Sequence, residues 1–113
     1  MLARPFRLVR SKDFDYLYRR GERLASVHLL VRIGLNHQPR SRFGIVVSTK
    51  ISKRATVRNR HKRQLREAIR PLLTILPTGW DVLVTVRQQF QKEGAWPELR
   101  SELTTLLVRR FSV

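Results

Sequence analysis

Half of the positive charge of this chain lies in one segment, from Lys50 to Arg70. The 113 residues include 24 Lys and Arg against 8 Asp and Glu, which gives a net charge of +16. In the segment, nine basic residues and one acidic residue, Glu67, give a charge of +8. The nine basic residues are Lys50, Lys53, Arg54, Arg58, Arg60, Lys62, Arg63, Arg66 and Arg70. The chain must fold so that these cations reach solvent or a polyanion, which places them on the surface of the molecule.

The apolar residues of the same segment predict a helix. One helical face is formed by residues spaced at i, i+3, i+4, i+7 and i+8, namely Leu65, Ala68, Ile69, Leu72 and Leu73. Pro71 should end or kink this helix near Arg70, because proline lacks an N–H group and crowds the preceding turn. The helix would therefore bury one side in a core and carry its arginines on the other side.

The basic side of this helix points to a phosphate-rich partner. Arg58, Lys62 and Arg66 form one row, next to a second row of Arg60, Arg63, Glu67 and Arg70. Like charges at this spacing cost about 0.2–0.5 kcal/mol per pair, and a surface that needed only solubility would interleave acids. Nucleic acid is favoured over an anionic membrane surface, since guanidinium groups bind phosphate through paired N–H donors.

Two further helices are predicted. Over Ser11–Arg20, three residues share one face, with Ser11 as the N-cap and Gly21 as the stop. These three residues are Phe14, Leu17 and Tyr18. The last helix should begin at Trp96-Pro97, with proline in its first turn. Its apolar stripe consists of Leu99, Leu103, Leu106, Leu107 and Phe111.

Three segments have the pattern of strands. Val27–Leu35 alternates with its apolar residues at odd positions, and a second strand runs from Phe43 to near Lys50. We expect these two to pair as an antiparallel hairpin. Trp80–Val86 is apolar at successive positions, which is typical of a strand buried on both faces. With Glu22–Ala25 as an additional short strand, the order predicts a single α+β domain over residues 1–113, a two-layer sandwich of helices on a small sheet.

The sequence excludes several classes of protein. The chain has no cysteine, which excludes disulfides, thiolate zinc sites and a cysteine nucleophile. Its apolar runs are far shorter than the ~20 residues of a transmembrane helix. Residues 1–10 lack the apolar stretch of a signal peptide, so we expect a cytoplasmic protein.

Residues that could support chemistry are few. His28 and His37 have no partners at metal-ligand spacing, and His61 in the basic helix is expected to contact RNA or solvent. Asp13, Asp15 and Glu22 fit helix capping and solvated roles better than a metal site. No nuclease motif is recognisable, so we assign no catalytic residue and no metal ligand to the chain.

Motifs along the chain occur in the order of a known family. Gly44-Ile45-Val46-Val47-Ser48-Thr49-Lys50 and the basic linker Ile51–Ala55 precede Arg58-Asn59-Arg60-His61-Lys62-Arg63 and Arg66-Glu67. Phe14, Tyr18 and Gly21 lie upstream, and Trp80-Asp81-Val82-Leu83-Val84 lies downstream. This ordered set, which spans essentially the whole chain, resembles the bacterial ribonuclease P protein subunit with its Arg-Asn-Arg helix.

The resemblance implies both a fold and a function. The fold has the order α-β-β-β-α-β-α, with a left-handed crossover around the basic helix where right-handed connections are the general rule. The function is that of a non-catalytic subunit of an endoribonuclease, whose catalytic RNA removes the 5′ leader of precursor tRNA. The partners implied are that RNA and precursor tRNA, with no membrane and no DNA. The protein is expected to bind no cofactor, and Mg²⁺ serves the holoenzyme through the RNA.

The resemblance also implies two RNA-binding surfaces. The catalytic RNA is expected at Lys53, Arg54, Arg58, Asn59, Arg60, Lys62, Arg63 and Arg66. The single-stranded leader is expected in a cleft between the first helix and the sheet, at Phe14, Tyr18, Arg32, Ser48 and Lys50. The alternation of the strands would bring His28, Leu30 and Val46 to the same sheet face. Aromatic stacking suits a leader of varied sequence, although Phe14 fits a core position equally well.

Three other functions must be weighed against this one. A general basic RNA-binding protein, such as a ribosomal protein, would not need a second, aromatic cleft for single strands. A self-sufficient nuclease would need metal-binding acids, for which the sequence gives no support. A DNA-binding helix-turn-helix does not fit, because a strand rather than a helix precedes the basic helix.

Overall fold

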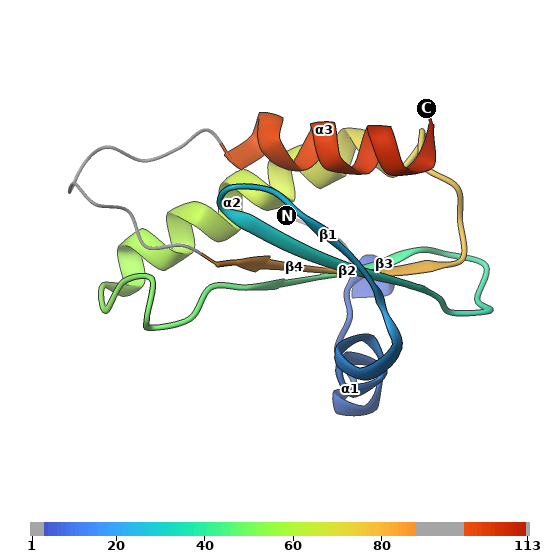
Figure 1. Ribbon diagram of the computed structural model, residues 1–113, viewed down its shortest axis with the longest axis horizontal. Coiled ribbons are helices and arrows are strands. Elements are labelled where there is room, and N and C mark those ends of the chain that lie inside the picture. Colours follow the sequence, from blue (N-terminus) through green and yellow to red (C-terminus); the bar gives the residue numbers. More distant parts are fainter. Residues whose placement is uncertain (1–3, 88–98, 113) are drawn as a thin grey trace.

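Four strands form one mixed sheet in the computed structural model, which describes residues 4–87 and 99–112 (Figure 1). The order across the sheet is β1-β2-β4-β3. The strands are β1 (Glu22–Ala25), β2 (Leu29–Leu35), β3 (Arg42–Val46) and β4 (Trp80–Val86). β2 is antiparallel to both β1 and β4, whereas β3 runs parallel to β4.

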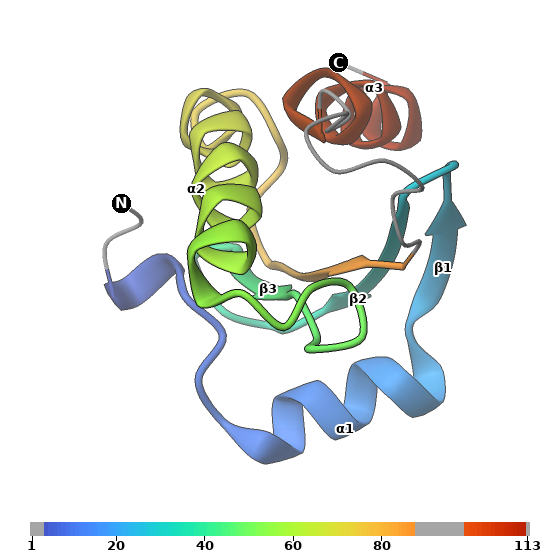
Figure 2. The ribbon, with the colours of Figure 1, turned by 90° about the vertical axis from the view of Figure 1, so that its left-hand side faces the viewer.

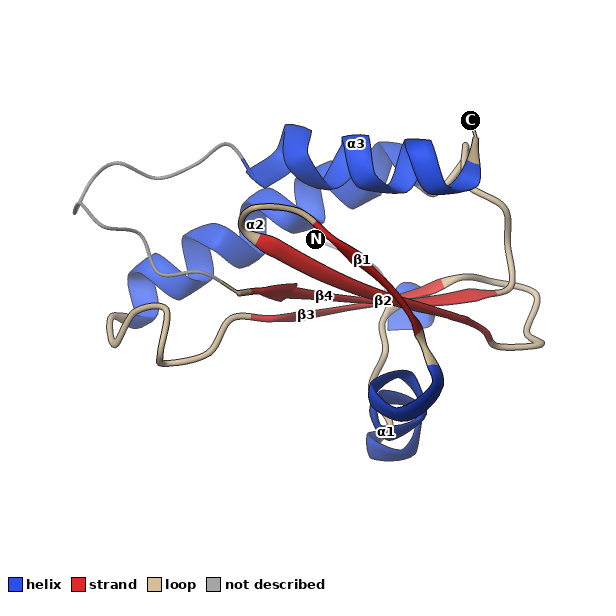
Figure 3. Cartoon of the chain, viewed as in Figure 1, coloured by secondary structure: helices blue, strands red, loops and turns tan. Residues whose placement is uncertain are grey.

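Helices cover the two faces of the sheet unequally. The helices are α1 (Ser11–Arg20), α2 (Ala55–Leu72) and α3 (Leu99–Phe111), preceded by the short 3-10 helix η1 (Arg4–Phe6). Figure 2 shows α2 and α3 side by side over one face, with α1 beneath the other. Figure 3 shows the same two layers by element type. The predicted α+β sandwich is confirmed, and so is the short strand at Glu22–Ala25.

The predicted hairpin between β2 and β3 is wrong, because β4 lies between these two strands. β4 is buried on both faces along most of its length. A strand of this kind is stabilised most at the centre of a sheet, with neighbours on both edges. The segment 36–41 therefore passes over the end of β4, and Asn36 fixes it by donating from Nδ2 to the Arg40 carbonyl at 3.0 Å.

The connection from β3 through α2 to β4 is a crossover between parallel neighbours. In Figure 1, β4 runs toward the left of the view, and in Figure 2, seen from that side, β3 lies to the left of β4 with α2 above them. A path that rises from β3, returns through α2 and descends into β4 in this arrangement is left-handed. The structure therefore has the crossover that the family resemblance implies.

The larger core lies between the sheet and the pair α2 and α3. It contains Leu29, Val31 and Ile33 of β2, alternate residues of β3 and β4, and the apolar stripes of both helices. The predicted stripe of α3 is confirmed: Leu99, Leu103 and Leu107 are fully buried, and Leu106 and Phe111 pack against them. On the other face, Leu8, Leu17 and Leu83 form a small second core beneath α1.

Several element ends differ from the predictions. Ser11 is the first helical residue rather than the N-cap, since Arg10 occupies the cap with no side-chain hydrogen bond. β2 begins at Leu29 and leaves Val27 62% exposed, and β3 ends at Val46 rather than near Lys50. Pro71 lies in the last turn of α2, and the helix ends one residue later, at Leu72, because proline cannot donate to the preceding turn and crowds it. The predicted start at Trp96-Pro97 lies outside the described residues.

Gly21 ends α1 as predicted, but by a different mechanism from a left-handed cap. Its backbone is extended, with φ −68° and ψ 144°, and its N–H donates to the Leu17 carbonyl at 3.0 Å. A Cβ atom at this position would lie 2.6 Å from that oxygen. Glycine is needed here because the chain passes so close to the last turn of the helix.

Candidate nucleic-acid interface

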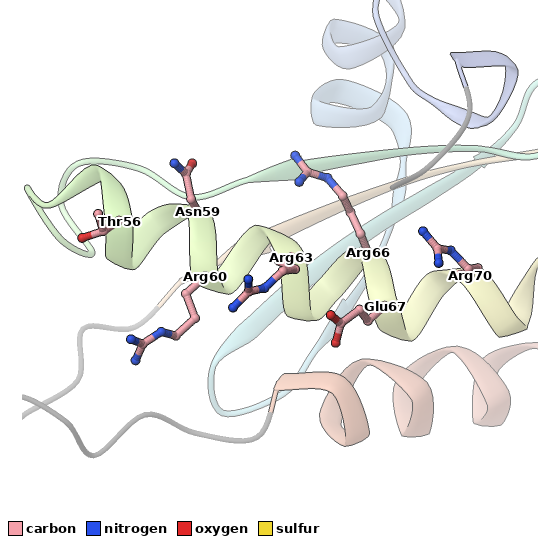
Figure 4. Close-up of a pocket in the computed structure, with 7 residues that line it drawn as sticks. All are labelled: Thr56, Asn59, Arg60, Arg63, Arg66, Glu67 and Arg70. Carbon is pink, nitrogen blue, oxygen red and sulfur yellow. The ribbon is translucent and has the colours of Figure 1, made fainter.

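α2 has one buried side and one basic side. The buried residues are Val57, His61, Leu65, Ala68, Ile69 and Leu72. The opposite side lines an open groove with a volume of about 680 Å³ (Figure 4). The groove residues are Thr56, Asn59, Arg60, Arg63, Arg66, Glu67 and Arg70. The helix thus presents four arginines to one groove, taken from both of the predicted rows.

The one acid of this groove is paired with α3. Arg100 Nη1 donates to Glu67 Oε2 at 3.0 Å, and Figure 4 shows Glu67 pointing toward α3. Within the described part of the chain, Arg60, Arg63 and Arg66 have no acidic partner at ion-pair distance. Their guanidinium groups are therefore available to phosphate oxygens.

Four of the predicted RNA-binding cations do not line the groove. Arg58 is half-buried and donates from Nη1 to the Ser52 carbonyl at 2.8 Å, which ties the basic linker to the first turn of α2. Lys62 is half-buried on the same flank. Lys53 and Arg54 are exposed in the linker, where the Ser52 hydroxyl accepts a hydrogen bond from the Arg54 N–H at 3.1 Å. The structure thus groups Asn59, Arg60, Arg63 and Arg66 and places the other predicted residues beside them.

His61 does not contact solvent, contrary to the sequence-based expectation. Its side chain is fully buried on the inner side of α2. Burial lowers the pKa of His61, and the positive charge of neighbouring Arg60 lowers that pKa further. His61 is therefore a neutral core residue at pH 7. The signal was present in the sequence, since His61 is four residues from both Val57 and Leu65.

The face under α1 carries the aromatic residues. Phe14 is half-buried and packs against the small core of Leu8, Leu17 and Leu83. Gly44 makes room for it, since a Cβ there would lie 3.2 Å from Phe14 Cε1. Phe14 thus makes the core contact that its helical position allows, and its part in the leader cleft stays a prediction.

Tyr18, one turn further along α1, is 51% exposed. The Cζ atom of Arg32 lies 4.7 Å from the centre of the Tyr18 ring. Tyr18 and Arg32, predicted independently for the cleft, are in direct contact.

A buried ion pair fixes α1 to the sheet. Arg42 donates from Nε and Nη2 to the two carboxylate oxygens of Asp81, at 2.9 and 2.7 Å, and its Nη1 lies 3.3 Å from Asp13 of α1. Asn36 Nδ2 also donates to Asp81, at 2.8 Å. The hydrogen bonds to Asp81 raise the pKa of Arg42 above its ordinary value. Sequence reasoning did not identify this network, because its members are far apart in the chain.

Three residues predicted for the sheet face lie elsewhere. Ser48 and Lys50 are exposed in a turn after β3, where the Ser48 hydroxyl accepts from the Lys50 N–H at 3.2 Å. His28 precedes β2 and bonds from Nδ1 to Glu102 Oε1 of α3 at 2.9 Å, on the opposite side of the sheet. Side chains alternate between the two sheet faces only within a strand. Leu30, Arg32 and Val46 lie within β2 and β3 and follow this rule, whereas Ser48, Lys50 and His28 lie beyond the strand ends.

Glu102 forms a second polar cluster with Ser26 and His28. Burial alone would raise the pKa of Glu102, but hydrogen bonds from the Ser26 hydroxyl and from the side chain and N–H of His28 together lower it. The cluster holds the β1–β2 turn against α3.

The described residues show neither a metal-binding cluster nor a membrane span. No three His, Asp or Glu side chains of residues 4–87 and 99–112 gather in a way that could hold a metal ion. In the same ranges, no helix combines the length and the apolar character required to cross a bilayer.

Comparison with known proteins identifies the family. Residues 2–110 match the Ribonuclease P family. The chain belongs to the ribonuclease P protein family. It is 41% identical to the ribonuclease P protein component of a Cyanothece species over 117 aligned positions, covering 82% of this chain and 89% of that protein. The component from a Pseudanabaena species is 39% identical, covering 96% of this chain and 94% of its own.

Solved structures agree with this assignment to the ribonuclease P protein family. The RNase P protein from Thermotoga maritima superposes with a TM-score of 0.81 at 33% identity, covering 91% of this chain and 98% of that one. The RNase P protein of Staphylococcus aureus gives a TM-score of 0.79 at 26% identity, over 93% of this chain and 94% of its own. The function of the family, as the protein component of an endoribonuclease in tRNA 5′ processing, applies to this chain.

Proposed function

We propose that this protein binds two RNAs on two separate surfaces, the catalytic RNA along α2 and the 5′ leader of precursor tRNA beneath α1. The observation that carries the proposal is the chemical difference between the surfaces. One is a groove of arginines without aromatic residues, and the other pairs an exposed tyrosine with an arginine. The two surfaces lie on opposite sides of the sheet (Figure 2).

The α2 groove suits a structured RNA. Such an RNA is bound mainly through its phosphates, and arginine forks bind phosphate oxygens in pairs. Lys53, Arg54, Arg58 and Lys62 extend the same positive surface toward the linker. A general RNA-binding protein would require only this surface, and the exposed Tyr18 with Arg32 on the α1 face favours the ribonuclease P function instead.

The surface beneath α1 suits a single strand. A base of any sequence can stack on an aromatic ring, so the exposed Tyr18 offers a contact that does not depend on leader sequence. Phe14 holds α1 in place by packing against the small core of Leu8, Leu17 and Leu83. Ser48 and Lys50, on the exposed turn after β3, are proposed to contact the leader at the other end of the sheet.

We assign the Mg²⁺ of the reaction to the catalytic RNA rather than to this chain. The acids nearest the cleft have other partners: Asp13 and Asp81 pair with Arg42, and Glu22 pairs with Arg110. Because the proposed partners are made in the cytoplasm, the protein is expected to act there.

The α2 surface is tested by replacing Arg60 with alanine. If about five phosphates are neutralised, log affinity for the catalytic RNA falls with log salt at a slope of about −4 to −5, and Arg60→Ala should flatten the slope by about one. Arg109→Ala, an exposed arginine on α3, is the matched control and should leave the slope unchanged. An Arg60→Ala variant with unchanged slope and affinity would remove Arg60 from the interface.

The α1 surface is tested by comparing Tyr18→Ala with Tyr16→Ala. Both tyrosines are on α1 and about half exposed, at 51% and 49%, but only Tyr18 contacts Arg32. In the holoenzyme, Tyr18→Ala should weaken binding of precursor tRNA by about 1–3 kcal/mol and leave mature tRNA unaffected. Equal losses for both RNAs, or an equal loss with Tyr16→Ala, would contradict the leader cleft.

A further inference from the structure

Two arginines face each other across the edge of the sheet. Arg23 of β1 is directly opposite Arg32 of β2 in the antiparallel register. Both side chains lie on the α1 face, since the neighbouring Leu24, Val31 and Ile33 belong to the core on the other face. Like charges directly opposite each other destabilise a strand pair. The pair therefore costs stability in the free protein.

The acids nearest this pair have other partners. Glu22, the residue before Arg23, accepts hydrogen bonds from Nε and Nη2 of Arg110 at 2.6 and 2.8 Å. Asp13, on α1, pairs with Arg42. Asp15 lies on the outer side of α1, in a groove with Lys12, Arg19 and Arg20. Throughout the described residues, neither the Arg23 nor the Arg32 side chain forms an ion pair or a hydrogen bond.

Arg32 is already positioned for a ligand. Its guanidinium group lies over the Tyr18 ring, with 4.7 Å between Cζ and the ring centre. A cation held on an aromatic face keeps its N–H donors, which lie in the plane of the guanidinium, available to an acceptor. The side chain is half-buried, so less of its freedom is lost when a ligand binds.

We propose that Arg23 and Arg32 form an anion site for one backbone phosphate of the single-stranded leader, next to the base that stacks on Tyr18. The phosphate lies between the two guanidinium groups and removes the repulsion between them. The site is at the β1 edge of the sheet, so it fixes where the leader leaves the cleft. This inference rests on the proposed leader cleft, which it deepens by assigning one phosphate to two arginines.

The test uses holoenzymes and precursor tRNAs that each carry one neutral methylphosphonate linkage in the leader. With the unaltered protein, one linkage should weaken binding about tenfold, as expected for the loss of a charge-assisted contact. With Arg23→Gln, binding of the normal leader should fall by about the same factor, and the methylphosphonate at that linkage should have no further effect. The salt slope should also flatten by about 0.7, the value for one phosphate of a single strand.

Controls separate this site from the rest of the cleft. Arg109→Gln removes the same charge from α3 and should retain the full methylphosphonate effect. Arg32→Lys keeps the positive charge but lacks the planar guanidinium fork, so it should retain part of the methylphosphonate effect. Inorganic phosphate, added up to millimolar concentrations, should compete weakly with precursor tRNA and not with mature tRNA. Melting temperatures of all variants show whether each remains folded, and Arg23 is exposed enough for its variant to fold.

Two results would overturn the proposal. The first is a methylphosphonate effect that is the same in Arg23→Gln and in the unaltered protein at every linkage. The second is an equal loss of mature and precursor tRNA in Arg23→Gln. If either result is found but Tyr18→Ala still weakens binding of precursor tRNA and not of mature tRNA, the leader cleft stands and only the arginine site fails. If Tyr18→Ala has no effect either, the leader cleft itself is wrong.

Discussion

Replacing Arg42 with methionine should strongly destabilise the protein. Methionine retains the apolar part of the side chain but removes both hydrogen bonds to Asp81 and the contact with Asp13. The carboxylate of Asp81 would keep only the hydrogen bond from Asn36. An almost buried negative charge would then be left without its cation, and α1 would lose its polar link to the sheet.

The size of the effect follows from burial. The side chain of Asp81 is 8% exposed and that of Arg42 is 22% exposed. Removing one partner of a buried ion pair costs about 3–5 kcal/mol, and the partial exposure of Arg42 favours the lower end, about 3 kcal/mol. For a domain of this size that loss lowers Tm by about 12 °C. The protein should remain folded at 25 °C if its stability lies in the usual range of about 5–15 kcal/mol.

The measurement is urea unfolding of the free protein at fixed salt, with a double-mutant cycle. Arg42→Met/Asp81→Asn should lose no more than Arg42→Met alone, because the double variant leaves no uncompensated carboxylate, and the coupling should be about 1–2 kcal/mol. Arg40→Met, an exposed arginine two residues away, is the control and should change stability by less than about 0.5 kcal/mol. Additive losses, or a loss below about 1 kcal/mol in Arg42→Met, would refute the role of this ion pair.

Three smaller perturbations test other parts of the fold. Gly21→Ala should destabilise by about 1–2 kcal/mol in urea unfolding, because the new Cβ would lie 2.6 Å from the Leu17 oxygen; unchanged stability would show that the helix end adjusts freely. The folded-state pKa of His61 is below 6.5, so stability should fall as pH drops below about 6.5, and His61→Leu should remove that dependence in a pH series of Tm. The folded-state pKa of Glu102 is also lowered, so its contribution to folding stability is present above about pH 4.5 and is lost as pH falls further. Glu102→Gln should therefore reduce the loss of Tm at acid pH. A loss of Tm at acid pH identical to that of the unaltered protein would contradict the Ser26 and His28 contacts.

Local elements could be predicted from sequence where one periodicity extended over a whole element. The apolar run Trp80–Val86 and the stripe from Leu99 to Phe111 gave correct elements, because each residue in them follows the same burial rule. Strand pairing could not be predicted in this way. The hairpin between β2 and β3 was the simplest interpretation of two neighbouring strands, but it ignored that β4, apolar on both faces, is stabilised most at the centre.

The sequence predicted many of the residues of the candidate site, but it predicted their positions in the structure less well. The Arg60, Arg63 and Arg66 surface follows from helical spacing, and Tyr18 with Arg32 follows from the faces of a helix and a strand. Ser48, Lys50 and His28 were misplaced because alternation was extended beyond the strand ends. Arg23 was missed because the register of β1, which sets it opposite Arg32, is determined by packing of Leu24 rather than by any local motif.

The central position of β4 has a consequence for synthesis of the chain on the ribosome. β4 is the last strand to be translated, and in the sheet order it is the only strand beside β3. About 40 residues separate Val46 from Val86, so β3 waits roughly 2–8 s for its neighbour at ordinary translation rates. During that interval β2 and β3 have no strand between them, and the six residues 36–41 are enough to join them as a non-native hairpin. Any hairpin formed in that interval would have to open before β4 could insert between its strands, so the native sheet can be completed only after Trp80–Val86 has been translated.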